Sequence, residues 1–371
     1  MRNFLRGVVL LAVCASGTWA GAQYVMTPLV SNGSVPGTHT DANLVNPWGL
    51  AASPTSFIWA ANNHSGTSTL YDGNGIAQSL VVTVPGVPAG SMGSPTGIVN
   101  YGGSGFVVTD GVNSGPSRFM FAAEDGTISG WSPNVPPSST AALTAVNNSA
   151  RTSIYKGLTL GVDGGQERLY ASDFHNGAVN VFNSGFGEIT TPGAFTDPTL
   201  PAGYAPFNVA NIGGNVYVTY ALQDANGEDD VPGPGHGYVD VFTPAGVMLS
   251  RFASGGALNS PWGMALAPAG FGAFGGDLLI GNFGDGRINA FNPANGAFLG
   301  ALSDGLGNPL VVDGVWGLLF GNGAHSQPTN TLYFSAGPNV EADGVYGRID
   351  VVPEPVGLCL ALCALTAIRR R

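Results

Sequence analysis

The residues best suited to chemistry in this sequence lie in short loops rich in asparagine, aspartate, histidine and glycine. Eight of them follow strand-like segments, and we treat them as candidate ligand-binding residues at the mouth of a channel: Asn62, Asn63, His64, Asp110, Asp173, His175, Asn282 and Asp285. Carboxylates and amides gathered in this way could bind a hard cation or a sugar. The alternative interpretation is that Asn, Asp and Gly form only the turns that join strands.

One loop, residues 223–236, is longer and more acidic than its counterparts. Its candidate ligands for a calcium ion are Asp224, Asn226, Glu228, Asp229 and Asp230. Oxygen-bearing residues at alternate positions suit calcium, although the glycine and the closing glutamate of an EF-hand loop are missing. The loop is therefore either a calcium site, the only cofactor that the sequence suggests, or a solvated acidic insertion.

Several catalytic chemistries are excluded by what the sequence lacks. Cys14, Cys359 and Cys363 lie close to the two ends, so residues 23–352 contain no cysteine for a disulfide, a zinc–thiolate site or thiol catalysis. Neither a His-Glu-x-x-His nor a Gly-x-Ser-x-Gly motif is present. We therefore assign no catalytic residue from the sequence.

The candidate loops are positioned by a repeat of about 50 residues, which is near the period of β-propeller blades. Each of six units begins with an apolar, glycine-containing segment, at 46–51, 94–99, 155–160, 205–209, 261–265 and 315–320. A second strand follows at 57–60, 105–110, 168–173, 215–219, 277–282 and 331–335. A third follows at 68–72, 126–131, 177–182, 237–242, 286–291 and 347–352. With a weaker fourth strand, such as 80–84, this pattern predicts an all-β, six-bladed β-propeller.

The first strand of each unit has the properties of an innermost strand. Proline suits its first position, and glycine lets neighbouring inner strands approach closely around the axis. Trp48, Trp262 and Trp316 share one repeat position, which predicts either core packing near the axis or an aromatic platform for a sugar. The sixth unit lacks a fourth strand, so we expect residues 24–30 to supply it and close the ring.

Composition and charge narrow the range of partners. The chain has 371 residues and a net charge of −11, with 12 basic and 23 acidic residues. Without the five arginines of the two ends and Glu354, 7 basic and 22 acidic residues remain, a net charge of −15 for residues 23–352. This negative charge argues against nucleic acid as a partner. It also repels other anionic polymers unless divalent cations intervene.

The two ends have the features of export signals. Arg2 and Arg6, the apolar run 7–16 and the small residues before Gln23 predict a signal peptide over 1–22, cleaved after Ala22 by signal peptidase. The other end, 353–371, joins a Pro-Glu-Pro sequence, a 13-residue apolar run and an arginine cluster. This run is shorter than the roughly 17 residues of a normal membrane span, which suits transient membrane association. The motif residues are Pro353, Glu354, Pro355, Arg369, Arg370 and Arg371.

This tail resembles the PEP-CTERM sorting signal, which an exosortase recognises and removes in Gram-negative bacteria. The repeat, with its Pro-x-Gly-[Leu/Ile]-Ala and Gly-x-Val-x-Val-Phe segments, resembles NHL-type six-bladed propellers. Over residues 24–352 it looks like an uncharacterised family of secreted bacterial propellers that carry this tail, with residues 44–50 and 223–231 the most similar. The resemblance implies delivery to the cell surface or extracellular matrix of a Gram-negative bacterium, and it implies no activity.

Three functions remain open from the sequence. The first is a non-catalytic binding module for a glycan or a protein, such as an extracellular polysaccharide or a surface protein, with or without calcium. The second is a calcium-dependent hydrolase or lactonase, and the third is a purely structural scaffold. A calcium-dependent enzyme needs acidic residues that project into the channel. The inner strands contain Trp-Gly-Leu-Ala, Thr-Gly-Ile-Val and Trp-Gly-Leu-Leu, without acids, which favours the binding module.

Overall fold

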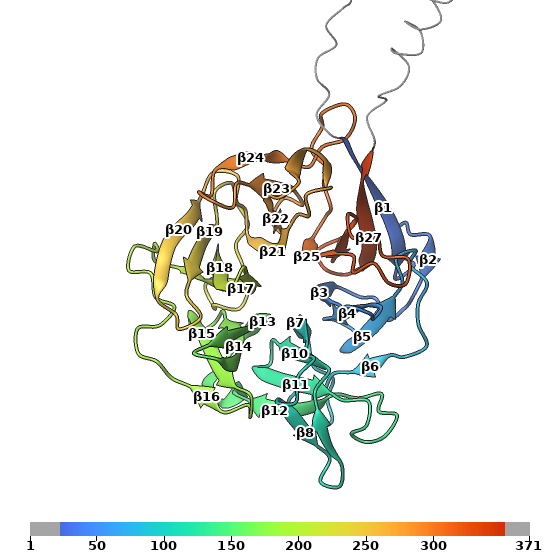
Figure 1. Cartoon of the computed structure of the whole chain (residues 1–371), viewed down its shortest axis with the longest axis vertical. Helices are drawn as coiled ribbons and strands as arrows, with labels where there is room; N and C mark the ends of the chain where they lie inside the picture. Colours follow the sequence, from blue (N-terminus) through green and yellow to red (C-terminus); the bar gives the residue numbers. More distant parts are fainter. Residues whose placement is uncertain (1–22, 353–371) are drawn as a thin grey trace, which may run out of the picture.

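Six β-sheets are arranged as blades around a central channel (Figure 1). The structure is a computed structural model, and it describes residues 23–352. The predicted all-β, six-bladed propeller is confirmed. The predicted signal peptide and the sorting tail lie outside the described residues. Within 23–352, no helix is long and apolar enough to cross a membrane.

Each blade has four antiparallel strands, of which the innermost is the first in the sequence of its repeat, and blade six carries the short strand β2 as a fifth. Blade one contains β3 (Pro47–Ala51), β4 (Ile58–Asn62), β5 (Thr67–Tyr71) and β6 (Val82–Thr83). Blade two contains β7 (Pro95–Asn100), β10 (Phe119–Ala123), β11 (Thr127–Trp131) and β12 (Leu143–Asn147). Blade three contains β13 (Tyr155–Asp163), β14 (Gln166–Asp173), β15 (Ala178–Asn183) and β16 (Glu188–Ile189).

Blades four to six repeat this order. Blade four contains β17 (Tyr204–Ile212), β18 (Asn215–Leu222), β19 (Tyr238–Phe242) and β20 (Met248–Ser254). Blade five contains β21 (Pro261–Leu266), β22 (Leu278–Asn282), β23 (Ile288–Phe291) and β24 (Phe298–Ala301). Blade six contains β25 (Val315–Phe320), β26 (Leu332–Ala336), β27 (Val345–Val352) and, from the other end of the domain, β1 (Gln23–Ser31). Two short 3₁₀ turns, η1 (Ser149–Arg151) and η2 (Gly272–Phe274), lie in connecting segments.

The ring is closed as the sequence predicts. Strand β1 pairs antiparallel with β27, from Gln23 opposite Val352 to Ser31 opposite Val345, with a bulge between Pro28 and Val30. A two-residue strand, β2 (His39–Thr40), pairs with the end of β1. The first strand of the domain therefore completes the last blade, and no blade lacks its outer strand.

Blade two differs from the prediction. Its second strand is β10, whereas residues 105–110 were expected there. Part of that segment instead forms β8 (Val107–Thr109), which pairs with β9 (Ser114–Pro116) as a separate hairpin. Burial explains why β10 and not residues 105–110 forms the second strand of this blade. Every residue of β10 is buried, whereas Val107 and Thr109 are exposed. The hairpin projects from the rim of the ring (Figure 1).

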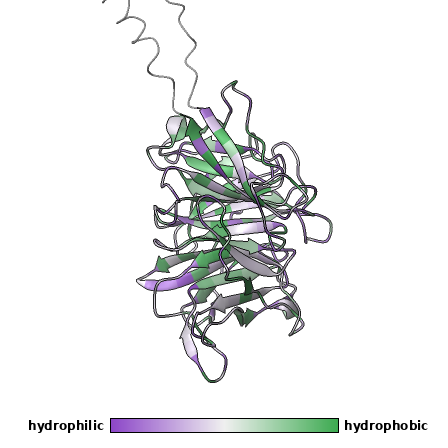
Figure 2. Ribbon diagram, turned by 90° about the vertical axis from the view of Figure 1, so that its right-hand side faces the viewer, coloured by the Kyte–Doolittle hydropathy of each residue, from purple (hydrophilic) through white to green (hydrophobic). Residues whose placement is uncertain are grey.

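The core is divided among the seams between blades. Each of six hydrophobic clusters contains residues from two adjacent blades, and a seventh lies on the axis. At one seam, the ring of Trp59 in blade one stacks on Phe119 in blade two, with centroids 3.9 Å apart. Figure 2 shows hydrophobic residues concentrated on the strands within the ring. Burial of apolar side chains between adjacent blades is therefore the main source of stability for this fold.

The glycines of the inner strands are required by close packing, as predicted. A Cβ added at Gly97 would lie 2.4 Å from the backbone nitrogen of Leu158, and one at Gly263 would lie 2.3 Å from the carbonyl oxygen of Trp316. Both distances are far shorter than van der Waals contact, so a larger residue at either position would force two blades apart.

The ring has two chemically different faces. One face, which we call the loop face, carries the loops between second and third strands and the starts of the inner strands. The opposite face, which we call the pocket face, carries the ends of the inner strands. Most of the candidate residues lie on the loop face.

Candidate functional site

An aromatic plug closes the channel near the loop face. It is formed by one aromatic residue at the same repeat position of each of four inner strands, which are Trp48, Phe207, Trp262 and Trp316. The rings of Trp48 and Trp316 stack with centroids 3.5 Å apart, and Trp262 meets both of them edge-on. All three tryptophans are buried, so they are core residues near the axis and do not form an exposed sugar platform.

Lys156 occupies the corresponding position of blade three and is the only lysine of the sequence. Its side chain is 1% exposed, and its ammonium lies 5.2 Å from the centroid of Trp48. The ammonium donates to Glu124 Oε1 at 2.5 Å and to Asp229 Oδ1 at 3.1 Å. Burial alone would lower the pKa of Lys156, but the two carboxylates raise it above its ordinary value. The site therefore holds a fixed positive charge over an aromatic ring.

Glu124 is placed by the β10–β11 loop of blade two. Its Oε2 accepts a hydrogen bond from Asn63 Nδ2 at 2.8 Å, so lysine and amide together engage both carboxylate oxygens. Burial by itself raises the pKa of this carboxyl, but the adjacent Lys156 ammonium holds it below its ordinary value. Glu124 is therefore ionised at neutral pH.

Glu341 comes from the β26–β27 loop of blade six. Its Oε2 accepts a hydrogen bond from Asn46 Nδ2 at 2.6 Å and lies 4.0 Å from His64 Nε2. Burial, together with the charges of Glu124 and Asp229, raises the pKa of Glu341 to about 7. Asn46 Oδ1 in turn accepts from Trp316 Nε1 at 3.1 Å, which ties the carboxyl to the aromatic plug.

The backbone that presents Glu341 is unusual. Asn339, Val340 and Glu341 all have positive φ, at 56°, 54° and 65°, and none of them is glycine. A left-handed conformation is costly for a β-branched residue such as Val340. Strained residues of this kind occur preferentially at functional sites.

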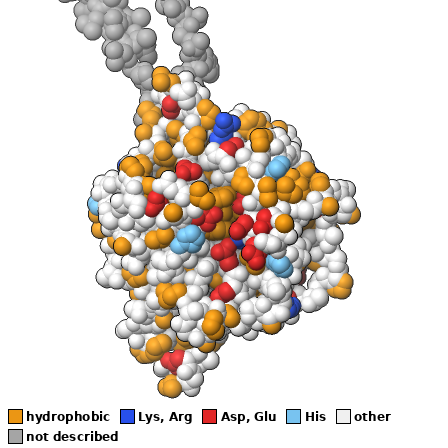
Figure 3. Space-filling model, turned by 180° about the vertical axis from the view of Figure 1, so that it is seen from behind, with side chains coloured by type: hydrophobic (Ala, Val, Ile, Leu, Met, Phe, Trp, Pro, Cys, Tyr) orange, Lys and Arg blue, Asp and Glu red, His pale blue; other side chains and the backbone are white. Residues whose placement is uncertain are grey.

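These residues form what we call the lysine site: Lys156, Glu124, Asp229, Glu341, Asn63 and His64. Blades two, four and six each contribute one carboxylate, and blade three contributes the lysine. Figure 3 shows acidic side chains gathered around the channel mouth on this face. Because carboxylates outnumber the single ammonium, the site favours a ligand that carries hydroxyl or cationic groups.

The structure places the eight predicted ligand-binding residues in different surroundings. Asn63 and His64 belong to the lysine site, and His175 lies in the β14–β15 loop of the same face. The others bond within or beside their own loops, as the turn interpretation predicts. Asn62 donates to Thr67 and Thr69.

Three more of these residues also support local structure. Asp173 accepts from the backbone of Ile154 and from Asn176, and Asn282 donates to Ala257 and to Asp285. The placement of Asp110 was wrong: it caps the β8–β9 turn on the outer rim, where it accepts from the backbone of Val112 and Asn113.

The structure does not bring the predicted calcium ligands together. Asp224 accepts backbone N–H groups of Glu228 and Asp229 within the loop, and Asp229 turns to Lys156. Asn226 and Glu228 are exposed, whereas burial raises the pKa of Asp230 to about 6. Between residues 23 and 352, no group of three or more His, Cys, Asp or Glu side chains is placed to hold one metal ion.

The sequence reasoning missed Lys156 and Glu124. Lys156 could have been found, because it replaces the tryptophan of the Pro-Trp-Gly pattern in the third repeat. Glu124 was missed because residues 105–110 were expected to form the second strand of blade two. Residue 124 then lay near the end of a long connection and not in the short β10–β11 loop. The meeting of residues from four blades depends on ring closure, which no local pattern encodes.

The comparisons with known proteins agree with this fold. No family model matches the chain. An uncharacterized protein of Acanthamoeba polyphaga mimivirus is 34% identical over 328 residues, covering 86% of this chain and 78% of that protein. A second uncharacterized protein of the same virus is 34% identical over 337 residues, covering 89% and 86%.

Two solved structures resemble the fold at low sequence identity. The soluble aldose sugar dehydrogenase of Escherichia coli, in its apo form, matches with a TM-score of 0.53 and 13% identity, over 88% of this chain and 99% of that chain. The virginiamycin B lyase of Staphylococcus aureus matches with a TM-score of 0.50 and 11% identity, over 89% and 100%. At these identities the likeness extends to the propeller fold alone.

Proposed function

The chain belongs to the same family as the two mimivirus proteins, and on that premise we propose that it is a non-catalytic binding module whose lysine site recognises a neutral or amino-bearing glycan. The observation that carries this proposal is the open, polar cluster held around Lys156 above a closed aromatic plug. A ligand there meets fixed hydrogen-bonding groups beside the exposed side chain of Asp229, which suits recognition of a polymer surface.

The charge of the site selects the class of glycan. Asp229 has a side chain that is 77% exposed, and that of His64 is 45% exposed, so both are accessible to a ligand. Carboxylates accept hydrogen bonds from sugar hydroxyls and attract ammonium groups. The acidic domain repels uronic-acid polymers. We therefore expect amino sugars to bind best, neutral sugars next and anionic sugars least.

The test is calorimetric titration of the propeller domain with chitosan, cello- and alginate oligosaccharides of equal length. We expect Asp229→Asn to weaken chitosan binding about tenfold, which corresponds to about 1.4 kcal/mol. Glu167→Gln is the matched control, because it removes one carboxylate from the pocket-face side of blade three. Absence of binding to all three oligosaccharides, or a preference for alginate, would contradict the proposal and favour a scaffold or a protein ligand.

A second candidate function is acid–base hydrolysis at the same site. It is favoured by the contrast between Glu341, whose pKa is raised to about 7, and Glu124, whose pKa is lowered. Two carboxyls with pKa values pushed apart are the usual pattern of a general acid and an ionised partner. Incubation with the same oligosaccharides, with and without added calcium, followed by mass spectrometry, would reveal shortened products if this function is present.

We also propose that the protein is exported. The support comes from the residues of this chain, namely Arg2, Arg6 and Ala22 at one end and the Pro-Glu-Pro and arginine motifs at the other. The relatives described above are viral, so they add nothing to the bacterial sorting hypothesis. Expression in a Gram-negative host with and without its exosortase tests it: we expect an N-terminus at Gln23 in both, and loss of the tail only with exosortase.

A further inference from the structure

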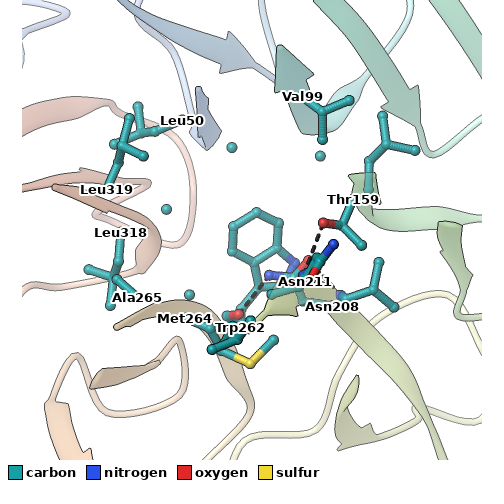
Figure 4. Close-up of a pocket in the computed structure, with 18 of the residues that line it drawn as sticks. Leu50, Val99, Thr159, Asn208, Asn211, Trp262, Met264, Ala265, Leu318 and Leu319 are labelled. Carbon is teal, nitrogen blue, oxygen red and sulfur yellow. Dashed lines mark hydrogen bonds between the residues drawn. The ribbon is translucent and has the colours of Figure 1, made fainter. Parts of the chain in front are cut away.

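A cavity lies at the opposite end of the channel from the lysine site (Figure 4). It has a volume of about 400 Å³ and opens on the pocket face. We propose that this cavity, which we call the channel pocket, binds an uncharged, largely apolar small molecule that carries one or two hydrogen-bonding groups. This site is independent of the glycan proposal, because it uses different residues on the other face.

The side chains of the channel pocket are mainly aliphatic. Figure 4 shows Leu50, Val99, Met264, Leu318 and Leu319 around the opening, each from an inner strand. No charged side chain is among the lining residues. The contrast with the acidic loop face is large, and a charged ligand would find no partner here for its charge.

Polar groups in the wall come chiefly from the backbone. Each inner strand pairs with one neighbour only, so the backbone N–H and C=O groups of its other edge face the channel. Thr159 and Asn211 add side-chain polarity at the rim, where the backbone N–H of Asn211 donates to Thr159 Oγ1 at 3.1 Å. An apolar pocket of a few hundred Å³ with a few placed polar groups is typical of small-molecule sites.

The repeat is irregular at one position that lines the pocket. Five inner strands have glycine at one shared repeat position, such as Gly49 after Trp48, and β17 has Asn208 there. The Asn208 side chain spans the seam and donates to the carbonyl oxygen of Trp262 at 2.7 Å. Strands β17 and β21 are accordingly the least closely packed of the neighbouring inner pairs. About half of the lining residues come from these two strands and the turn that follows β17, at 208–213 and 262–266.

The aromatic plug separates the channel pocket from the lysine site. The indole of Trp262 lies at the inner end of the pocket, and its Nε1 donates to the backbone oxygen of Lys156 at 3.2 Å. The plug is buried and tightly stacked, so a ligand that enters from the pocket face cannot contact Lys156. Instead it lies near Trp262, whose fluorescence can report its presence.

The experiment is a fluorescence titration of the propeller domain, residues 23–352, whose own first and last strands close the ring. The probe is N-phenylnaphthylamine, which is uncharged and apolar, and the comparison is its sulfonated analogue, anilinonaphthalenesulfonate. We expect saturable enhancement of the first probe with quenching of tryptophan emission. We expect binding of the sulfonated probe to be weaker by about tenfold or more, since the pocket offers no cation.

Two variants locate the binding. Leu319→Asp introduces a carboxylate into the pocket, and Leu299→Asp introduces the same group at an exposed position of the outer strand β24. We expect about a tenfold loss of probe binding in the first variant and none in the second. Ala265→Phe fills the pocket without adding charge, and it should weaken binding even if Leu319→Asp folds poorly. Equal binding by wild type and Ala265→Phe, or no saturable binding by wild type, would overturn the proposal.

Discussion

At the scale of single residues, Lys156 is the feature that distinguishes this propeller. It stands at a repeat position that is aromatic in four of the other five blades, and its charge is balanced by carboxylates from two other blades. A buried ion pair of this kind adds little net stability compared with apolar packing. Removal of one partner nevertheless destabilises the fold strongly, because it leaves a buried charge uncompensated. The ion pair is therefore better explained by its effect on position, because Lys156 holds the carboxylates of Glu124 and Asp229 at the channel mouth.

Lys156→Met tests this explanation. Methionine fits the space, but Glu124, whose side chain is 27% exposed, would lose its cation beside apolar rings. We expect a loss of about 3 kcal/mol in the free energy of unfolding at pH 7, measured by urea denaturation. The double variant Lys156→Met with Glu124→Gln should recover most of this loss. A single variant as stable as wild type would show that the pair is not desolvated.

Glu341 should make stability depend on pH. Burial raises its pKa to about 7 from an ordinary value of 4.5, so between these values the folded chain holds a proton that the unfolded chain has lost. Stability therefore falls as pH rises through this window and levels off above it. The groups that face Glu341 are Asn46, His64, Glu124, Asp229 and Lys156.

Glu341→Gln cannot ionise, and urea denaturation across pH measures the difference. We expect the variant to be more stable than wild type by about 2 kcal/mol at pH 8. At pH 4 the carboxyl is protonated in both states, so the two proteins should be equally stable, which is the internal control. A variant less stable than wild type at pH 8 would mean that the ionised carboxylate is stabilised in the fold.

At the scale of elements, strand β1 closes the ring by pairing with β27. Tyr24 in this strand is buried, its hydroxyl donates to the carbonyl oxygen of Phe271 at 3.1 Å, and its ring packs on Phe271 and Phe274. One strand therefore links the start of the domain to β27 and to blade five. Without it, β27 would present an unpaired edge to solvent.

Substitutions at Tyr24 measure how much ring closure by β1 contributes to the free energy of unfolding. We expect Tyr24→Phe to cost about 1 kcal/mol, the net contribution of one hydrogen bond, and Tyr24→Ala about 3 to 4 kcal/mol because a cavity forms. Deletion of 23–31 should lower the midpoint of thermal unfolding further and produce dimers or aggregates on size exclusion. A monomeric deletion variant with the wild-type midpoint would show that closure by β1 is dispensable.

At the scale of the whole molecule, the distribution of the core predicts cooperative unfolding. Each of the six seam clusters is shared by two blades, and the axial cluster contains residues from five. Loss of one blade would expose two clusters at once, so no blade forms a separate stable unit. A closed ring also has no terminal repeats from which unfolding could begin, unlike a linear solenoid.

We therefore expect one unfolding transition in urea for residues 23–352. Tryptophan fluorescence reports on the plug and on the Trp59–Trp131 seam, and far-UV circular dichroism reports on all blades. The two probes should give the same midpoint. A fluorescence change that precedes the loss of β-structure would indicate that the plug opens while the ring stays folded.

The sequence by itself determined the blade count, the inner strands and the closing strand. These features follow from local alternation of apolar residues and from glycine and proline at fixed repeat positions, which constrain the backbone wherever the segment lies. Only the tertiary structure decided that Lys156, Glu124, Asp229 and Glu341 meet, that Asp110 does not join them, and that Asn208 bonds across the seam between blades four and five. Such contacts join blades distant in sequence, so they are set by how the ring closes and by which charge each buried group can reach.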